Sequence, residues 1–390
     1  MNLVNSYFCS KKGMIPRTQT ENIRQGLGKG KAVVVIGPRQ VGKTTLVRQI
    51  TQTLDRKTLW LTGDDPETRS LLDNIGLARL QTLIGQNEVV VVDEAQRFTN
   101  AGLMLKLITD HLPRVQLFVT GSSSLDLAAQ TKESLTGRKF GYPLYPLSFV
   151  EMTDHHGYLA EHALLEHRML YGYYPEVVQN DPPRAQKILN DLSDGLMYKD
   201  LLSLDQIKKP SLLVKLLQAL ALQVGSEVSY PEVAQLIGAD PLTVEKYTDL
   251  LEQSFVVFRL PSLSRNARNE IKKGRKIYFF DNGIRNAILK NFSPLALRPD
   301  TGALWENFLL AERMKRNAYT DYFCNTYFWR TTTQLEIDYV EDAGGRLHAF
   351  EFKWQAKKPA RFPAAFLENY PGSQTTMITR ENFDAFIGLP

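Results

Sequence analysis

A glycine-bounded loop ending in lysine and threonine is the segment of this chain best suited to chemistry. It reads Gly37-Pro38-Arg39-Gln40-Val41-Gly42-Lys43-Thr44 and is followed by Thr45. The spacing fits the pattern G-x-x-x-x-G-K-[ST], in which backbone N–H groups cradle phosphate oxygens. Lys43 can reach the β- and γ-phosphates of a nucleotide, and the Thr44 hydroxyl can bind Mg²⁺. We therefore predict a nucleotide-binding P-loop over residues 37–45.

A second stretch whose residue types could take part in catalysis is a run of four valines that ends in the carboxylates of Asp93 and Glu94. Alone, such a pair is typical of a solvated turn. After an intact P-loop, the first carboxylate supports Mg²⁺ and the second polarises the attacking water. A GTPase of the Ras kind positions the attacking water with a glutamine instead of a carboxylate. We predict ATP as the substrate, with Asp93 supporting Mg²⁺ and Glu94 activating water.

Two polar residues farther along the chain fit supporting roles in the same reaction. Ser122 directly follows the next apolar strand, and we predict that it senses the γ-phosphate. Arg138, in Leu135-Thr136-Gly137-Arg138, is the candidate arginine finger that neutralises charge on the transferring phosphoryl group. If Arg138 acts on a neighbour's site, activity requires a homo-oligomer, such as a hexameric ring. The alternatives are a glycine-serine turn and a surface arginine.

The elements that position these residues alternate between strand and helix. Apolar runs predict strands at 32–36, 58–61, 89–92 and 115–120, and helical segments separate them. This alternation predicts an α/β fold with a parallel sheet covered by helices on both faces. Both nucleotide motifs then fall at the carboxyl ends of the strands, where ligands bind in such sheets.

Composition limits the class of protein. The chain has 390 residues, of which 43% are hydrophobic and 23% charged, and its net charge is +5. The two cysteines, Cys9 and Cys324, exclude a disulfide framework and a cysteine-rich zinc site. No apolar run approaches the roughly 20 residues that cross a bilayer, and the first thirty residues are polar and carry no apolar signal core. We expect a cytoplasmic protein without a membrane partner.

The pattern divides the chain into four expected domains. These are a P-loop ATPase domain at 1–150, a helical lid or connector at 151–225, a winged-helix-like domain at 226–290 and a mixed α/β domain at 291–390. The third rests on helices at 230–237 and 241–253 and on a strand pair around a basic loop. That loop carries Arg265, Arg268, Lys272, Lys273 and Arg275 against a single Glu270. A basic hairpin after two helices predicts DNA as a partner, and the alternative is an ordinary solvated hairpin.

The last expected domain carries a second set of reactive residues. Glu351 and Lys353 lie two positions apart and so share one face of a strand. Asp338 can lie opposite them on the adjoining strand, and Glu306 lies upstream on an amphipathic helix. Carboxylates around a lysine are the layout of a metal-dependent nuclease, and these positions resemble the PD-(D/E)XK nuclease fold. The alternative is a half-buried strand pair whose alternating charges form ion pairs.

The whole chain resembles the prokaryotic AAA-type ATPases that pair a P-loop domain with a C-terminal domain of uncharacterised function. Besides the P-loop, the resemblance rests on Asp93-Glu94-Ala95-Gln96, Thr120-Gly121-Ser122-Ser123, Thr136-Gly137-Arg138, Tyr145-Pro146-Leu147-Ser148-Phe149-x-Glu151, Gly172-Tyr173-Tyr174-Pro175-Glu176-Val177-Val178, Tyr198-Lys199-Asp200-Leu201 and Leu304-Trp305-Glu306-Asn307-Phe308. The family pattern usually has a glycine where Tyr173 stands, which we interpret as local packing. The resemblance implies an AAA-like ATPase fold and says little about the biological task.

Two classes of function follow from these observations. In the first, ATP turnover moves or remodels DNA, which the C-terminal domains grip or cut. In the second, the protein is a nucleotide-controlled regulatory switch whose C-terminal domains bind protein partners. Stimulation of ATP turnover by DNA would favour the first class.

Overall fold

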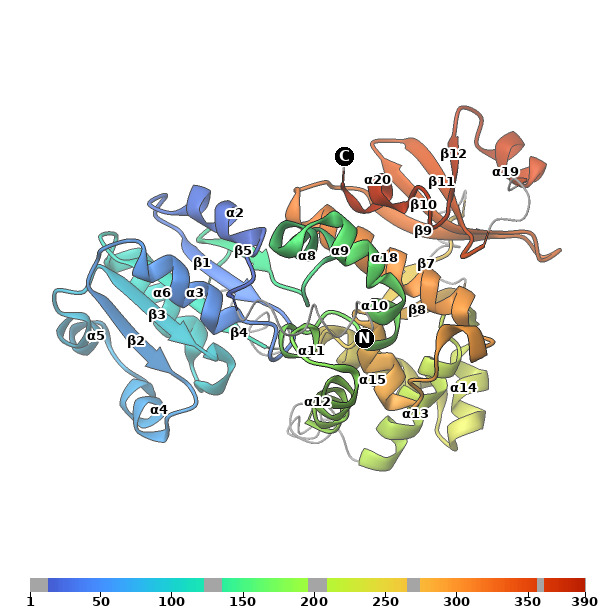
Figure 1. Cartoon of the computed structure of the whole chain (residues 1–390). Coiled ribbons are helices and arrows are strands. Elements are labelled where there is room, and N and C mark those ends of the chain that lie inside the picture. The colour runs from blue at the N-terminus through green and yellow to red at the C-terminus, as the bar shows by residue number, and fades with distance from the viewer. Residues whose placement is uncertain (1–12, 123–134, 196–208, 265–273, 356–360, 390) are drawn as a thin grey trace. The chain divides into compact units, whose positions relative to one another are not determined.

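A computed structural model describes residues 13–122, 135–195, 209–264, 274–355 and 361–389. The chain forms two compact units (Figure 1). Of the described residues, those within 15–147 and 253–255 form one unit, and those within 148–252 and 256–389 form the other. The division of the chain into four domains stays a prediction.

The first unit is built on a five-stranded parallel sheet in the order β2-β3-β4-β1-β5. Its strands are β1 (Ala32–Ile36), β2 (Thr58–Thr62), β3 (Val89–Asp93), β4 (Gln116–Gly121) and β5 (Lys139–Pro143). Its helices are α2 (Gln19–Gly26), α3 (Lys43–Gln52), α4 (Pro66–Leu72), α5 (Leu77–Ile84) and α6 (Ala101–His111), with a 3-10 turn η1 (Ala95–Arg97). The predicted parallel α/β sheet is confirmed, and β5 is a strand that the sequence pattern missed.

Alternation along the strands produces two apolar faces on this sheet. One face of β1 and β3, including Val34 and Val90, packs in a buried cluster with Leu80 of α5 and Leu105 of α6. Helices lie on both sides of the sheet (Figure 1). Burial on both faces explains why these strands read as continuous valine runs.

The second unit begins with helices and then alternates helices with short strands. Its helices are α8 (Phe149–His156), α9 (Tyr158–Ala163), α10 (Leu165–Tyr171), α11 (Pro175–Val178), α12 (Pro182–Gly195), α13 (Pro210–Leu222), α14 (Tyr230–Ile237), α15 (Pro241–Gln253), α17 (Asn282–Ile288), α18 (Thr301–Tyr319), α19 (Ala364–Asn369) and α20 (Phe383–Ile387), with a 3-10 turn η3 (Leu295–Leu297). The strands β6 (Glu227–Val228), β7 (Val257–Pro261) and β8 (Arg275–Phe279) form an antiparallel sheet in the order β6-β8-β7. Most of the basic loop, including Arg265, Arg268, Lys272 and Lys273, lies outside the described residues, as does the Tyr198–Leu201 motif.

A mixed four-stranded sheet follows α18. Its strands β9 (Asn325–Arg330), β10 (Glu336–Ala343), β11 (Arg346–Phe352) and β12 (Gln374–Ile378) are ordered β12-β11-β10-β9. The first three are antiparallel, and β12 runs parallel to β11 after α19. The two sheets of this unit are joined directly, because the Leu263 amide beyond β7 donates to the Phe328 carbonyl of β9 at 2.7 Å.

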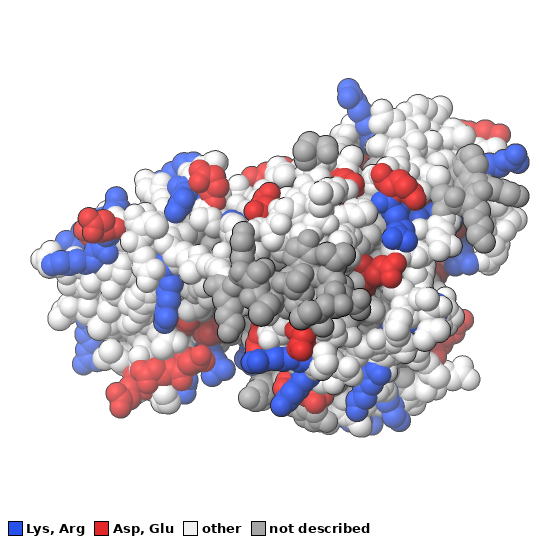
Figure 2. Space-filling view, viewed as in Figure 1, with Lys and Arg blue, Asp and Glu red and all other residues white. Residues whose placement is uncertain are grey.

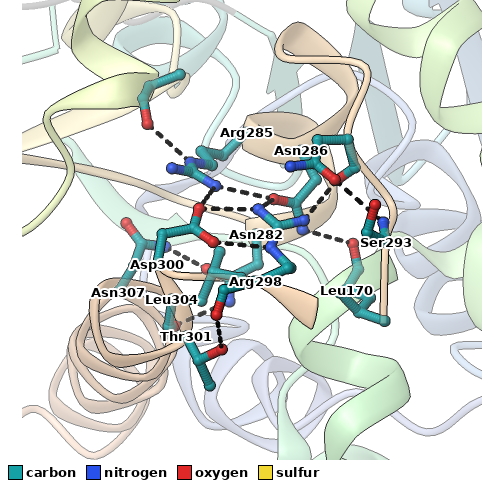
Figure 3. Close-up of polar contacts among 12 residues, drawn as sticks. Leu170, Asn282, Arg285, Asn286, Ser293, Arg298, Asp300, Thr301, Leu304 and Asn307 are labelled. Carbon is teal, nitrogen blue, oxygen red and sulfur yellow. Dashed lines mark hydrogen bonds and ion pairs between the residues drawn. The ribbon is translucent and has the colours of Figure 1, made fainter. Parts of the chain in front are cut away.

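Helix α17 is a buried polar hub of the second unit (Figure 3). Its Asn286 donates to the Leu170 carbonyl of α10 at 2.9 Å, and its Asn282 donates to the Leu304 carbonyl of α18 at 3.0 Å. Arg285 pairs with Asp300 at 2.6 Å. Buried side chains of this kind must be satisfied internally, so the hub fixes how the surrounding helices pack.

The glycine that precedes the Tyr-Tyr-Pro-Glu segment has a defined structural role. Gly172 has φ +71°, and a Cβ at this position would lie 2.0 Å from Asp281 Oδ1. Asp281 accepts the Tyr173 amide at 2.6 Å and caps α17 through the Ile284 amide at 3.2 Å. Tyr173 itself is buried, and its hydroxyl donates to Glu161 at 2.7 Å. This buried contact is the local packing expected for Tyr173.

Candidate functional site

The P-loop connects a buried strand to a helix with little room to spare. β1 ends at Ile36, and α3 begins at Lys43 after Gly42, whose φ is 93°. A Cβ on Gly37 would lie 1.9 Å from the Leu144 carbonyl oxygen. Glycine at both positions therefore permits a backbone path that a side chain would obstruct.

Lys43 folds back over the loop that it follows. Its side chain is 5% exposed, and Nζ donates to the Gly37 and Pro38 carbonyls at 3.0 and 2.6 Å. The ammonium therefore lies against the concave side of the loop, where phosphate oxygens would replace the carbonyls as its acceptors.

Thr44 and Asp93 meet across the carboxyl edge of the sheet. Thr44 Oγ1 donates to Asp93 Oδ1 at 3.0 Å. Thr44 lies on α3, which follows β1, and Asp93 ends β3, so the contact passes over β4, which lies between these two strands. Thr120 at the end of β4 also donates to Asp93 Oδ1. A hydroxyl and a carboxylate oxygen at this separation are hard ligands of the kind that Mg²⁺ prefers, so these residues fit the predicted ion.

Glu94 turns back toward the same edge in an uncommon backbone conformation. Its φ is +50°, and its amide donates to Thr120 Oγ1 at 3.1 Å. Its carboxylate accepts hydrogen bonds from Gln96 Nε2 and, at 3.2 Å, from Ser122 Oγ. Gln96 also donates to Ser122 Oγ at 2.9 Å. The two residues predicted to activate water and to sense phosphate are therefore in direct contact.

Gln96 and Arg17 belong to this site and were not singled out from the sequence. Gln96 lies in the quoted Asp93–Gln96 motif, which was the available signal. Arg17 donates to the Val41 carbonyl of the P-loop and to the Tyr145 carbonyl, both at 2.6 Å. It lies twenty-four positions before Val41, and no local pattern marks it. Arg17 holds the P-loop against the segment that follows β5.

Arg138 lies at the opposite end of the sheet from the P-loop. Its carbonyl accepts the Ala32 amide at the start of β1, and its Nε pairs with Asp110 Oδ1 at 2.5 Å. A five-residue strand spans about 16 Å, so Arg138 does not reach the phosphate site of its own chain. The prediction that it serves a neighbour's site stays a prediction.

Family comparison divides the chain into three segments. Residues 29–153 match the family described as an AAA domain. The parallel sheet and P-loop of residues 15–147 have the fold of a P-loop NTPase domain. Beyond this P-loop NTPase domain, residues 162–295 and 301–386 match two families that are each described as a domain of unknown function (DUF8612 and DUF4143).

Similar proteins extend over both units. An uncharacterised protein of Mycobacterium tuberculosis is 27% identical over 340 residues, which are 86% of this chain and 73% of that protein. An uncharacterised protein of Methanocaldococcus jannaschii is 22% identical over 330 residues, covering 80% and 72% of the two chains. Among solved structures, a Walker-type ATPase of Pyrococcus abyssi has 16% identity and a TM-score of 0.48, covering 71% of this chain and 96% of its own. These curated relatives are uncharacterised, so the function is argued from the residues.

The four residues predicted as a nuclease site do come together in the second unit. Glu306 lies on α18, Asp338 on β10 and Glu351 on β11. The Lys353 ammonium is 2.7 Å from Glu351 Oε1, and the Phe352 amide donates to Asp338 Oδ2 at 2.7 Å. The register of β10 and β11 places Asp338 opposite Glu351, because Tyr339 pairs with Phe350.

Burial and two residues that the sequence analysis did not single out, Lys276 and Glu336, change the electrostatics of this cluster. Burial, together with the charges of Glu306 and Glu351, raises the pKa of Asp338 to about 8. Burial also raises the pKa of Glu306. The ammonium of Lys276, from β8, lies 3.1 Å from Glu306 Oε1 and 2.6 Å from Glu336 Oε1. An internal cation therefore sits among the carboxylates.

The surface around the expected DNA-binding elements is mixed in charge. The exposed and half-exposed charged side chains of α15 are Glu245, Lys246, Asp249 and Glu252. Arg259 of β7 pairs with Glu252 at 2.8 Å, and it also pairs with Asp249. Figure 2 shows basic and acidic side chains interspersed over the viewed face. Within the described ranges, no helix combines the length and apolar character that a bilayer crossing requires.

Proposed function

We propose that the protein is a Mg²⁺-dependent ATPase in which the P-loop NTPase domain hydrolyses ATP. The observation that carries the proposal is the meeting of Thr44 and Asp93 beside Lys43, with the Glu94 carboxylate next to them along the same sheet edge. Thr44 and Asp93 would hold Mg²⁺, which neutralises phosphate charge when bound.

The reaction assigned to this site is attack of water on the γ-phosphorus. The water oxygen forms a bond to phosphorus, the bond to the bridging oxygen breaks, and ADP leaves with the electron pair. Glu94 orients the water and takes its proton. Lys43 exchanges the Gly37 and Pro38 carbonyls for phosphate oxygens, and the loop amides bind the remaining charge.

Steady-state ATP hydrolysis and separate nucleotide-binding measurements test this assignment. Lys43→Ala should weaken ATP binding at least about tenfold, since the ammonium contacts phosphate in both ground and transition states. Glu94→Gln should retain binding and lose about 100-fold or more of kcat, because the amide cannot take the proton. Glu88→Gln, at the amino end of β3 on the exposed surface, is the matched control and should behave as the wild type. Normal turnover by Glu94→Gln would refute the choice of base.

For the second unit, we propose a winged-helix arrangement of α13, α14, α15 and the β6-β8-β7 sheet that binds a protein partner. Asp249 and Glu252 of α15 pair with Arg259 of β7, so charges of both signs alternate over this surface. A DNA-binding helix needs an excess of positive charge, which α15 does not offer. Leu242 of α15 is 77% exposed. This combination favours a partly apolar protein segment with mixed charges and the regulatory-switch class.

The DNA alternative rests on the basic loop, most of which lies outside the described residues. Its test is ATP turnover with and without single- and double-stranded DNA at one fixed salt concentration. Turnover that is indifferent to DNA, with no DNA binding detected, supports the protein-partner proposal. Stimulation by DNA that is lost when Lys272 and Lys273 become alanine would replace it with the motor.

A further inference from the structure

Lys276 is a fully buried lysine at the junction of the two sheets of the second unit. It lies on β8, and its side chain is 0% exposed. Its Nζ contacts Glu306 of α18 at 3.1 Å and Glu336 of β10 at 2.6 Å. A lysine is almost never buried completely unless its charge is balanced, so these carboxylates are its structural counterpart.

The electrostatic balance keeps Lys276 charged. Burial works against the ammonium form, but the carboxylates of Glu306, Asp338 and Glu336 outweigh it and raise the pKa of Lys276. The ring of Phe328 also lies 5.5 Å from Nζ, as in a cation–π contact. The ammonium is therefore a fixed positive charge inside the carboxylate cluster.

The oxygens that a nuclease metal would need already accept hydrogen bonds. Glu306 Oε1 accepts from Lys276 and from the Tyr278 hydroxyl, and Asp338 Oδ2 accepts from the Phe352 amide. Glu351 accepts from Lys353. In the described part of the chain, no three His, Cys, Asp or Glu side chains are placed to hold a metal ion together. A divalent cation would also face the nearby ammonium of Lys276, so the residues present do not fit Mg²⁺.

We propose that the ammonium of Lys276 is the resident cation of this cluster and occupies the place that Mg²⁺ takes in a metal-dependent nuclease. The cluster then joins β8 to α18 and β10 as an ionic lock. It binds no catalytic divalent ion and cuts no phosphodiester bond. The proposal concerns the second unit alone and is independent of ATP hydrolysis in the first.

The central variant is Lys276→Met in the full-length chain, which keeps the aliphatic length and removes the charge. The uncompensated carboxylates should lower Tm by on the order of 10 °C. Mn²⁺ or Mg²⁺ at millimolar concentration should recover part of this loss, because a divalent ion can then enter the vacated position. The wild type should show no Tm change with either ion and no heat of binding by titration calorimetry in the absence of nucleotide.

Lys315→Met is the matched control. Lys315 is also buried on α18 and pairs with Glu312 at 2.7 Å, but it stands outside the cluster. The control should lose stability comparably and gain nothing from Mn²⁺. Rescue of both variants, or of neither, contradicts the assigned cation position.

Two further measurements decide the matter if Lys276→Met does not fold. Lys276→Met combined with Glu306→Gln lowers the unbalanced charge and should fold better than the single variant. Nicking of supercoiled plasmid by the wild type with Mn²⁺ should be absent. Binding of Mn²⁺ to Lys43→Ala protein, removed by Asp338→Asn, or plasmid nicking that Asp338→Asn abolishes, would overturn the proposal.

Discussion

At the scale of the residue, the hydrogen bonds around Glu94 set the orientation of the proposed catalytic base. Its left-handed backbone conformation costs roughly 1–3 kcal/mol and turns the carboxylate toward Gln96 and Ser122. Both hydrogen bonds come from protein donors, so they fix the direction in which the carboxylate points. The described arrangement therefore restrains Glu94, and nucleotide binding must redirect it for proton transfer.

Gln96→Leu tests this restraint. Loss of the Gln96 donor should leave the Glu94 carboxylate freer to face water, and we expect kcat for ATP to rise by roughly three- to tenfold. KM should change little, because Gln96 contacts neither Lys43 nor Thr44. Steady-state kinetics measure both parameters. A fall in kcat would instead mean that Gln96 positions Glu94 for catalysis.

Gly172 provides a prediction about stability at the same scale. Gly172→Ala should cost about 3 kcal/mol, because its Cβ would collide with Asp281 Oδ1 at a positive φ. The control is Gly157→Ala, which has φ +96° and no atom within 4 Å of the added carbon. It should lose about 1 kcal/mol from the backbone alone. Urea unfolding compares them, and equal losses would exclude the collision as the cause.

At the scale of the element, helix α10 carries a histidine that is held neutral. Burial, followed by the charge of Arg168, lowers the pKa of His167 to about 3 despite the opposing effect of Glu161. The Tyr171 ring lies 4.6 Å away, centroid to centroid. Because the unfolded chain protonates near pH 6.5, the stability linked to His167 is present above that pH and is lost as pH falls toward 3.

His167→Gln removes this titration. Between pH 7 and pH 4, the wild type should lose on the order of 3 kcal/mol of unfolding free energy more than the variant loses. Tryptophan fluorescence during urea unfolding of a Trp60→Phe background follows this unit, because Trp305, Trp329 and Trp354 lie in it and Trp60 lies in the other. His111→Gln, at an exposed position in the other unit, should leave this pH dependence unchanged. Parallel pH curves for wild type and His167→Gln would contradict the assignment.

Helix α2 shows how an element outside the motif can support the site. Arg17, two residues before α2, donates hydrogen bonds to the Val41 and Tyr145 carbonyls. These contacts connect the start of the unit to its P-loop and to the segment after β5. The order of the loop therefore depends on residues at both ends of the first unit.

At the scale of the whole molecule, Arg138 is too far from its own P-loop to contact nucleotide there, so the proposed finger requires an oligomer. Its side chain is on the far end of the sheet from its own P-loop and pairs with Asp110. If the proposed finger acts between protomers, Arg138→Ala and Glu94→Gln proteins should each be inactive alone. Mixed together, they should recover about a quarter of wild-type turnover, because random pairing restores one interface in four.

The mixing experiment is read with subunit exchange confirmed by native mass spectrometry. Full activity of Arg138→Ala alone would exclude the finger. Exchange without recovered turnover would show that Arg138 does not complete a neighbour's site. A Lys106→Ala protein, altered on α6 at an exposed position, is the control and should hydrolyse ATP as the wild type does.

The sequence alone determined the nucleotide motifs and the sheet that presents them. Glycine spacing, a lysine and a valine run are contiguous signals, and a continuous apolar run marks a strand that is buried on both faces. The sequence also predicted that one site contains Glu306, Asp338, Glu351 and Lys353. The prediction that the protein binds DNA rests largely on residues 265–273, which lie outside the described part of the chain.

Only the tertiary structure decided what surrounds these motifs. Lys276 reaches Glu306 across thirty positions, and Ser122 reaches Glu94 across twenty-eight. No local periodicity encodes such pairs, because each depends on how separately formed elements pack and on which charges that packing buries. The same carboxylates that read as metal ligands in sequence therefore surround an ammonium in the folded protein.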